Sequence, residues 1–259
     1  MYADPTIFDV MPLIILNSAV IFIYLLYLVI NRKHQKFKEI RSDAHTMKFT
    51  LKIMEFWYWL TTPVFKFFIR SKMQLNTLTT IGLLLSVAAA FSFANGYIAS
   101  AGWLVLLAGS MNFFEHRVGR HIHAETKSSF FYNAVLKNLA DGILFLGLMV
   151  MYYDHWMFYV AFSGFLMFMM IVYTKEMGEN LGVDVKIGIN NNVERIAFIG
   201  APAAIWPMIY AIFEPWFPFF EYDLGTRVGL IVILILSAQA FYTRFIKVYS
   251  SLGGRFRRH

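Results

Sequence analysis

The stretch NFFEHRVGRHIHAETKSSFFYNAVLKNLAD, residues 112–141, runs from the end of one apolar segment into the start of the next. Its polar or small residues at helical spacing are Asn112, Glu115 and Gly119, followed by Ser129, Asn133, Lys137 and Asp141. The second set steps by four residues and therefore shares one helix face. A short polar connection over 120–128 makes the two helices antiparallel neighbours, with both polar stripes at one membrane surface. Polar clusters inside apolar helices are candidate functional sites, and we place the candidate site here.

The composition indicates a membrane protein with several spans. Of the 259 residues 58% are hydrophobic, and the mean hydropathy is +0.55. Several apolar runs reach the about 20 residues that cross a bilayer core. The polar stretches between them are too short to bury a separate core. The absence of cysteine excludes disulfides and thiolate metal sites.

The hydropathy pattern predicts one N-terminal membrane helix, an amphipathic helix over 47–71 in the cytoplasmic interface, and six core helices. The expected spans are 10–30, 76–94, 98–117, 130–152, 155–175, 194–213 and 224–247. A cleaved signal peptide is disfavoured at the N-terminus because the apolar run is too long and no basic start precedes it. The expected organisation is an N-terminal helix and basic linker (1–46), a membrane domain (47–252) and a basic tail (253–259).

The basic residues predict the orientation of these helices. The connections assigned to the outside are 1–9, 95–97, 153–154 and 214–223, and they contain no Lys or Arg. Of 23 basic residues only Arg227 lies near the outer face. The positive-inside rule then places the N-terminus outside and the C-terminus in the cytoplasm, in a plasma or inner membrane. The net charge of +7 is explained by this asymmetry, and no nucleic-acid partner is expected.

The segment 73–120 resembles the opening of the CDP-alcohol phosphotransferase family, membrane enzymes of phospholipid synthesis. Its start matches the family's Pro-Asn-x-Leu-Thr element at Leu75, Asn76, Leu78 and Thr79, with Leu in place of Pro. The family signature Asp-x2-Asp-Gly-x2-Ala-Arg-x8-Gly-x3-Asp-x3-Asp falls, without a gap, on Asn112, Glu115, His116, Gly119, Arg120, Ser129, Asn133 and Lys137. Further matches are Tyr173, Lys175, Glu179, Leu181, Gly182, Lys186, Gly188, Glu194 and Arg195. The resemblance covers roughly 56–252 and implies an all-α fold with a six-helix core, and a homodimer.

The departures from the signature concern its chemistry. The resemblance implies four aspartates that hold two divalent cations, the last one also acting as general base. This chain has two amides, one carboxylate and one ammonium there: Asn112, Glu115, Asn133 and Lys137. These charges sum to zero without metal, and an ammonium group repels Mg²⁺ or Mn²⁺. We therefore expect Lys137 to pair with Glu115, and we expect no metal and no catalytic residue.

Other interpretations of the same residues stay open. A frame shifted by four residues would bring Asp141 onto the last aspartate position, at the cost of an insertion in the connection. The Glu115 and Lys137 pair could fix helix register, bind a ligand or take part in catalysis. His116, His121 and His123 could suggest a metal cluster, but only His121 and His123 are close in sequence, and their two-residue spacing points them to different helix faces. Interfacial histidines solvated at the headgroups are the favoured interpretation.

Four basic residues remain at the cytoplasmic end as candidates for holding a lipid phosphate: Arg120, Lys175, Lys186 and Arg195. The positive-inside rule explains the positions of these four residues equally well. The functional hypothesis is a catalytically degenerate family homologue that acts as a scaffold or lipid-binding subunit of a membrane complex, without cofactor. The alternative is an active enzyme that transfers a phosphoalcohol group from a CDP-activated donor to an alcohol, using Mg²⁺ or Mn²⁺ and releasing CMP. A transporter is disfavoured because the charged residues gather near one face.

Overall fold

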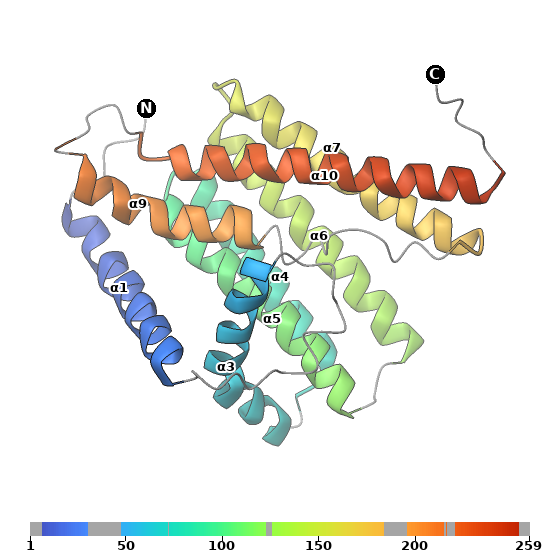
Figure 1. Cartoon of the computed structure of the whole chain (residues 1–259), viewed down its shortest axis with the longest axis horizontal. Coiled ribbons are helices and arrows are strands. Elements are labelled where there is room, and N and C mark those ends of the chain that lie inside the picture. The colour runs from blue at the N-terminus through green and yellow to red at the C-terminus, as the bar shows by residue number, and fades with distance from the viewer. Residues whose placement is uncertain are drawn as a thin grey trace.

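The computed structural model describes residues 7–30, 48–71, 73–122, 126–183, 196–214, 216 and 221–253, and all regular structure within these ranges is helical. The elements are α1 (Ile7–Ile30), α3 (Lys48–Arg70), α4 (Leu75–Ala94), α5 (Ile98–Ile122), α6 (Lys127–Met151), α7 (Met157–Asn180), the π-helix η1 (Ile196–Gly200), α9 (Ala201–Phe213) and α10 (Leu224–Ser251). The expected all-α membrane fold is confirmed. In Figure 1, α4, α5 and α6 run together through the molecule, and α9 and α10 lie beside one another.

Five helices are long and apolar enough to cross a membrane: α4, α5, α6, α7 and α10. Two further described segments, 14–29 and 198–213, are apolar but shorter. Each of the apolar helices found among the described residues had been predicted from the sequence. Two of the seven expected crossings have described apolar stretches that are shorter than a full span. The second of these begins as η1 rather than as an α-helix, and it contains Pro202 and Pro207.

Helix ends near the candidate site differ from the sequence prediction. α5 continues to Ile122 instead of ending at Arg117, α6 begins at Lys127, and α7 reaches Asn180. The expected connection over 120–128 was therefore too long. Polar residues do not stop a helix once it leaves the hydrocarbon, and the start of α6 is set by a cap: Thr126 Oγ1 accepts a hydrogen bond from the Ser129 backbone nitrogen at 3.1 Å.

Two apolar clusters hold the helices together. The larger joins α4, α5, α6, α7, η1 and α10 around fully buried residues such as Phe93, Phe145, Leu148, Met157 and Leu230. The smaller, Phe68, Leu75, Leu78, Phe114 and Val118, joins the end of α3 to α4 and α5. Many large apolar side chains remain exposed around the outside, which is expected where lipid is the surrounding solvent.

Small residues let helix backbones touch. A Cβ atom on Gly147 would stand 2.5 Å from the backbone of Ala90, so α6 and α4 are in direct backbone contact there. A Cβ atom on Gly102 would stand 2.3 Å from the backbone nitrogen of Ala204, which brings α5 equally close to α9. Such contacts at small residues are the usual basis of helix packing in membranes.

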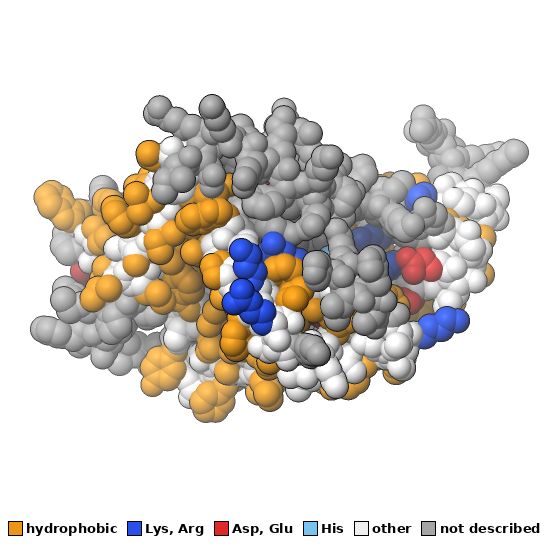
Figure 2. Space-filling model, turned by 90° about the horizontal axis from the view of Figure 1, so that it is seen from below, with side chains coloured by type: hydrophobic (Ala, Val, Ile, Leu, Met, Phe, Trp, Pro, Cys, Tyr) orange, Lys and Arg blue, Asp and Glu red, His pale blue; other side chains and the backbone are white. Residues whose placement is uncertain are grey.

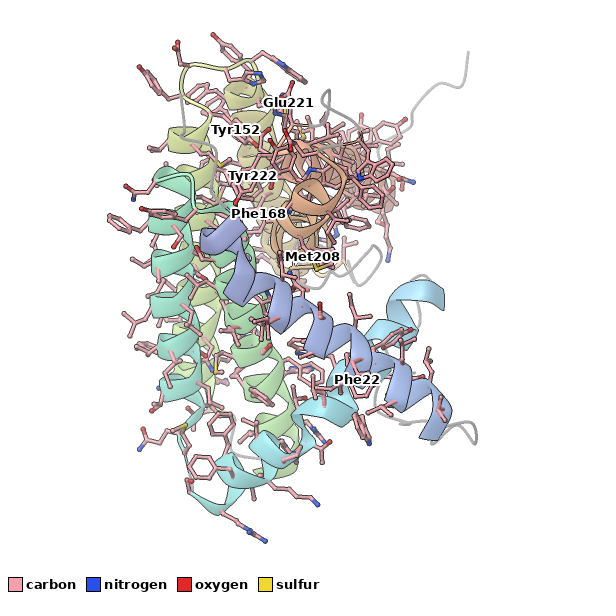
Figure 3. All side chains as sticks on the ribbon, turned by 90° about the vertical axis from the view of Figure 1, so that its left-hand side faces the viewer. Phe22, Tyr152, Phe168, Met208, Glu221 and Tyr222 are labelled. Atoms are coloured by element: carbon pink, nitrogen blue, oxygen red, sulfur yellow. The ribbon has the colours of Figure 1, made fainter. Side chains whose placement is uncertain are left out.

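α1 and α3 pack obliquely against this bundle (Figure 3). They meet through aromatic rings, with Phe56 of α3 at 4.9 Å from Tyr24 and 5.5 Å from Tyr27 of α1, between ring centroids. Trp57 Nε1 donates to Ser110 Oγ of α5 at 3.0 Å, which fixes α3 to the bundle. The predicted amphipathic helix is confirmed as a helix, with Phe68 buried and Lys66 and Arg70 exposed. Its position in the membrane interface stays a prediction.

Candidate functional site

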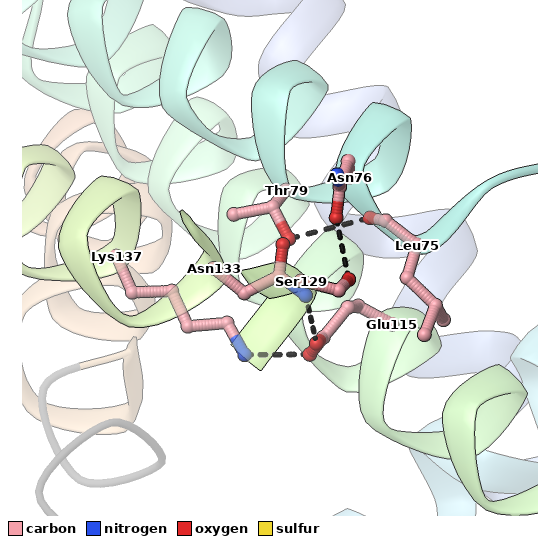
Figure 4. A network of polar contacts seen from close by, with 7 residues as sticks. All are labelled: Leu75, Asn76, Thr79, Glu115, Ser129, Asn133 and Lys137. Atoms are coloured by element: carbon pink, nitrogen blue, oxygen red, sulfur yellow. Dashed lines mark hydrogen bonds and ion pairs between the residues drawn. The ribbon is translucent and has the colours of Figure 1, made fainter. Parts of the chain in front are cut away.

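The signature positions of α5 and α6 meet near the ends of these helices. Glu115 Oε2 accepts a hydrogen bond from Lys137 Nζ at 2.5 Å, and Glu115 Oε1 accepts one from Asn133 Nδ2 at 2.9 Å (Figure 4). The carboxylate is buried, with 6% of its side chain exposed, while Lys137 keeps 22%. The ion pair expected from the sequence is present, and an amide completes it.

A second contact joins the same face of α6 to α4. Ser129 Oγ donates to Asn76 Oδ1 at 2.6 Å, and Thr80 Oγ1 lies 3.0 Å from Tyr132 Oη. Asn76 was expected only as part of the family resemblance and not as a residue of the site. Its four-residue spacing to Thr80 repeats the spacing on α6 and could have indicated this. We call Asn76, Glu115, Ser129, Asn133 and Lys137 the polar seam.

The other signature positions surround the polar seam less tightly. Asn112 is half-buried on α5, and its Oδ1 atom lies 3.6 Å from the position of a Cβ on Gly82 of α4. Gly119 is buried and His116 is exposed. Arg120 lies within α5, but its side chain is outside the described residues, as are the side chains of His121 and His123. Ser129, Asn133 and Lys137 contact α4 and α5, and Asp141, one turn further along α6, is half-buried, so the choice between the ungapped and the shifted frame stays a prediction.

The chemistry of these donors decides whether two divalent cations fit. Mg²⁺ and Mn²⁺ need several oxygen ligands, with carboxylates preferred. In the polar seam both oxygens of Glu115 already accept hydrogen bonds, and the groups turned toward them are an amide nitrogen and an ammonium. Asn133 Oδ1 is buried without a hydrogen-bond partner, so it is one remaining acceptor. No group of three or more His, Asp or Glu suited to a metal occurs among the described residues. The residues present therefore do not fit a pair of divalent cations.

The four residues predicted to hold a lipid phosphate are only partly placed. Lys175 lies near the end of α7, exposed, with its Nζ 4.0 Å from Glu179 Oε1. Lys186 and Arg195 fall in 184–195, outside the described residues. Figure 2 shows Lys and Arg side chains gathered in the middle of the face seen from below. Arg117 is one basic residue that the sequence analysis passed over, and its guanidinium carbon stands 3.8 Å from the ring centroid of Phe65.

The opposite end of the bundle carries a separate charged group. Arg227 pairs with Glu221 and, at 2.8 Å, with Asp223. Figure 3 places Glu221, Tyr152 and Tyr222 together at this end. Burial, followed by the nearby Asp223 carboxylate, raises the pKa of Tyr152, and burial raises the pKa of Tyr222 to about 12. These contacts balance the charge of Arg227 with two carboxylates, at the end of the bundle that the charge pattern predicts to face outward.

Known proteins resemble this chain in sequence and in fold. No model of a known protein family matches the chain. An archaetidylinositol phosphate synthase of Methanothermobacter thermautotrophicus is 25% identical over 205 residues, which cover 73% of this chain and 93% of that protein. Crystal structures of the Mycobacterium tuberculosis phosphatidylinositol phosphate synthase share the fold at 20% identity and cover 77% of this chain. The form with bound CDP-DAG has a TM-score of 0.60, and the form with manganese and citrate one of 0.61; they are matched over 98% and 93% of their lengths.

The expected resemblance is thus confirmed both in sequence and in fold. The motif positions that carry it lie together on adjoining faces of α4, α5 and α6. By its sequence and its fold, this chain resembles the CDP-alcohol phosphotransferases.

Proposed function

We propose that this chain is a non-catalytic member of its family, which retains the fold to hold a phospholipid in a membrane assembly. One observation carries the proposal: the Lys137 ammonium sits on the Glu115 carboxylate, at the positions where the family signature has metal-binding aspartates. The Glu115 carboxylate is thus already paired with a cationic group of the protein itself, the Lys137 ammonium.

The electrostatics support the loss of phosphotransfer. Cleavage of a pyrophosphate needs positive charge placed where negative charge develops on the phosphates. In the polar seam the positive charge of Lys137 is neutralised by Glu115, so little remains to act on a phosphate. The polar seam itself contains no second carboxylate to take a proton from an acceptor alcohol. The seam therefore stabilises the helices and contributes little to chemistry.

Lipid binding is proposed on a different basis. Basic side chains between helices at a cytoplasmic surface commonly bind lipid phosphates. Arg120, Lys175, Lys186 and Arg195 are basic positions of the matched region, and all belong to the cytoplasmic end of the proposed orientation. We propose them as the phosphate-binding group, in a protein with its N-terminus outside and its C-terminus in the cytoplasm of a plasma or inner membrane. The organisation into 1–46, 47–252 and 253–259 is part of the same proposal, as are partner subunits or a homodimer.

Native mass spectrometry of the detergent-purified chain tests lipid binding. A co-purifying anionic phospholipid should be depleted when Lys175, Lys186 and Arg195 are changed to Gln. The control is Lys66→Gln, which removes an exposed basic residue of α3 at the same end. Equal lipid retention in both variants would refute the phosphate-binding group.

The second candidate is a working transferase, and the relatives favour it directly. The matched proteins are described as synthases, one with CDP-DAG bound and one with manganese. Under this candidate the chain would transfer a phosphatidyl group from CDP-diacylglycerol to an alcohol such as inositol phosphate. Glu115 and Asp141 would have to hold at least one Mg²⁺ or Mn²⁺, with Lys137 steering a phosphate.

Release of CMP separates the two candidates. The purified chain is incubated with CDP-diacylglycerol, Mn²⁺ or Mg²⁺, and inositol phosphate or other alcohols, beside the Mycobacterium tuberculosis synthase as positive control. We expect CMP from the control alone. Metal-dependent CMP release by this chain, abolished by Glu115→Gln, would establish the transferase and overturn the non-catalytic proposal.

A further inference from the structure

We infer that the polar seam replaces divalent cations as the cross-link between α4, α5 and α6, so that this fold is stable without metal. A protein of the same fold has been crystallised with manganese, whereas the residues at the seam do not fit such ions. The inference concerns how the helices are held together. It does not depend on whether the chain binds a lipid.

The direction of the hydrogen bonds supports this. Three successive turns of α6 present donors: the Ser129 hydroxyl, the Asn133 amide nitrogen and the Lys137 ammonium. The acceptors come from the facing helices, Asn76 on α4 and Glu115 on α5. A divalent cation between helices needs oxygen acceptors from each helix that surrounds it. Here α6 offers donors instead, so it binds the acceptors of α4 and α5 directly, and no cation is needed between the helices.

Burial makes these contacts effective. Glu115 and Asn133 are each 4% exposed, so water does not compete for their hydrogen bonds. A buried carboxylate is costly unless it is neutralised, and Lys137 supplies the neutralising charge within the same cluster. The seam is therefore complete in charge and nearly complete in hydrogen bonds, with Asn133 Oδ1 as a remaining acceptor.

The test measures the apparent melting temperature of the full chain in detergent, with EDTA and with excess Mn²⁺. For the unaltered chain we expect the same value in both. A triple variant replaces the donors of α6 with acceptors and creates, together with Glu115, a group of four carboxylates: Asn112→Asp, Asn133→Asp and Lys137→Asp. We expect it to melt lower in EDTA, to recover in Mn²⁺, and to bind Mn²⁺ by electron paramagnetic resonance.

A matched control distinguishes an effect of metal binding at the seam from an effect of the change in net charge. Gln74→Asp, Thr77→Asp, Lys127→Asp makes the same change in net charge at exposed positions of the same end. It should show no Mn²⁺-dependent recovery. The inference is overturned if the unaltered chain melts lower in EDTA than in Mn²⁺, or if the seam variant responds to Mn²⁺ no more than the control.

Single substitutions keep the inference testable if the triple variant does not fold. Lys137→Gln retains an N–H donor, whereas Lys137→Leu has none, so the Leu variant should melt several degrees lower than the Gln variant. Equal melting temperatures would contradict a donor role. The test of this inference can also be distinguished from the test of the proposed function. If the chain releases CMP and its melting temperature does not depend on metal, only the non-catalytic proposal is refuted. If its melting temperature depends on metal and no CMP is released, only this inference is refuted.

Discussion

Asn17 Nδ2 donates a hydrogen bond to the backbone oxygen of Ala204 at 2.9 Å, and both residues are buried. The contact joins α1 to α9 across 187 positions of sequence. An amide inside an apolar helix is costly in lipid unless it has a partner, and here the partner is a backbone oxygen next to the close contact of Gly102 with α9. The N-terminal helix is therefore part of the packed bundle.

Replacing Asn17 with Leu should lower the free energy of unfolding by about 1 kcal/mol, the usual size of a hydrogen bond between membrane helices. Leu keeps the γ-branched shape of Asn but can neither donate nor accept a hydrogen bond, so the contact with Ala204 is lost. Unfolding by SDS titration provides the measurement. Ser18→Ala, at an exposed position of the same helix, is the control and should change little. Equal values for the two variants would show that the contact is energetically neutral.

Lys137→Met should destabilise the protein by about 3–5 kcal/mol, because it leaves the Glu115 carboxylate buried without its cation. Adding Glu115→Gln should recover most of this loss, since the remaining amides are neutral. The double-mutant cycle is measured by the same SDS titration. If the double variant is as unstable as the single one, the two side chains do not stabilise each other.

Gly147→Ala should destabilise by about 1–3 kcal/mol, because the new Cβ would overlap the Ala90 backbone and force α4 and α6 apart. Gly142→Ala on the same helix is the matched control. Its Cβ would meet the Phe165 ring at 3.6 Å and the Met169 methyl group at 4.0 Å, both ordinary contacts, so the higher helix propensity of Ala should leave stability equal or improved. Similar losses at both positions would contradict the backbone contact.

Stability should fall in alkaline solution through Tyr222. Its pKa is raised by burial from 10.0 to about 12, so the protonated form is favoured in the folded state. This contribution is fully present below pH 10 and is lost as the pH rises toward 12. The apparent melting temperature of Tyr222→Phe should therefore decline less steeply than that of the unaltered chain across this window. Parallel declines would mean that Tyr222 titrates as an exposed phenol.

The positions of the helices could be predicted because apolar runs in lipid have few alternatives. Backbone groups must be satisfied within each segment, so an apolar run of sufficient length becomes a helix. The Glu115 and Lys137 pair was predictable for a related reason, since each is costly alone and both fall on facing stripes. Helix ends were less predictable, because polar residues such as His116 continue a helix as readily as they end it, and α6 starts where Thr126 caps it.

Partners distant in sequence could not be predicted from one chain. The hydrogen bond from Ser129 to Asn76 depends on the relative register of α4 and α6, and that from Asn17 to Ala204 on the approach of α1 to α9. Register is set by backbone contacts at small residues such as Gly147 and Gly102. Which glycine meets which neighbour is a property of the assembled bundle, and no local spacing specifies it.

The backbone contact between Gly147 and Ala90 also bears on the geometry of the polar seam. Neither helix can approach the other further at this point, so the contact is a fixed reference for the angle between them. Lys137 lies ten residues along α6, a lever arm of about 15 Å at 1.5 Å per residue, so a tilt of about 4° displaces it by roughly 1 Å. A small change in the angle between α4 and α6 at the glycine would therefore shift the donors of α6 relative to Asn76 of α4 by about an ångström, which is comparable with the distance tolerance of a hydrogen bond.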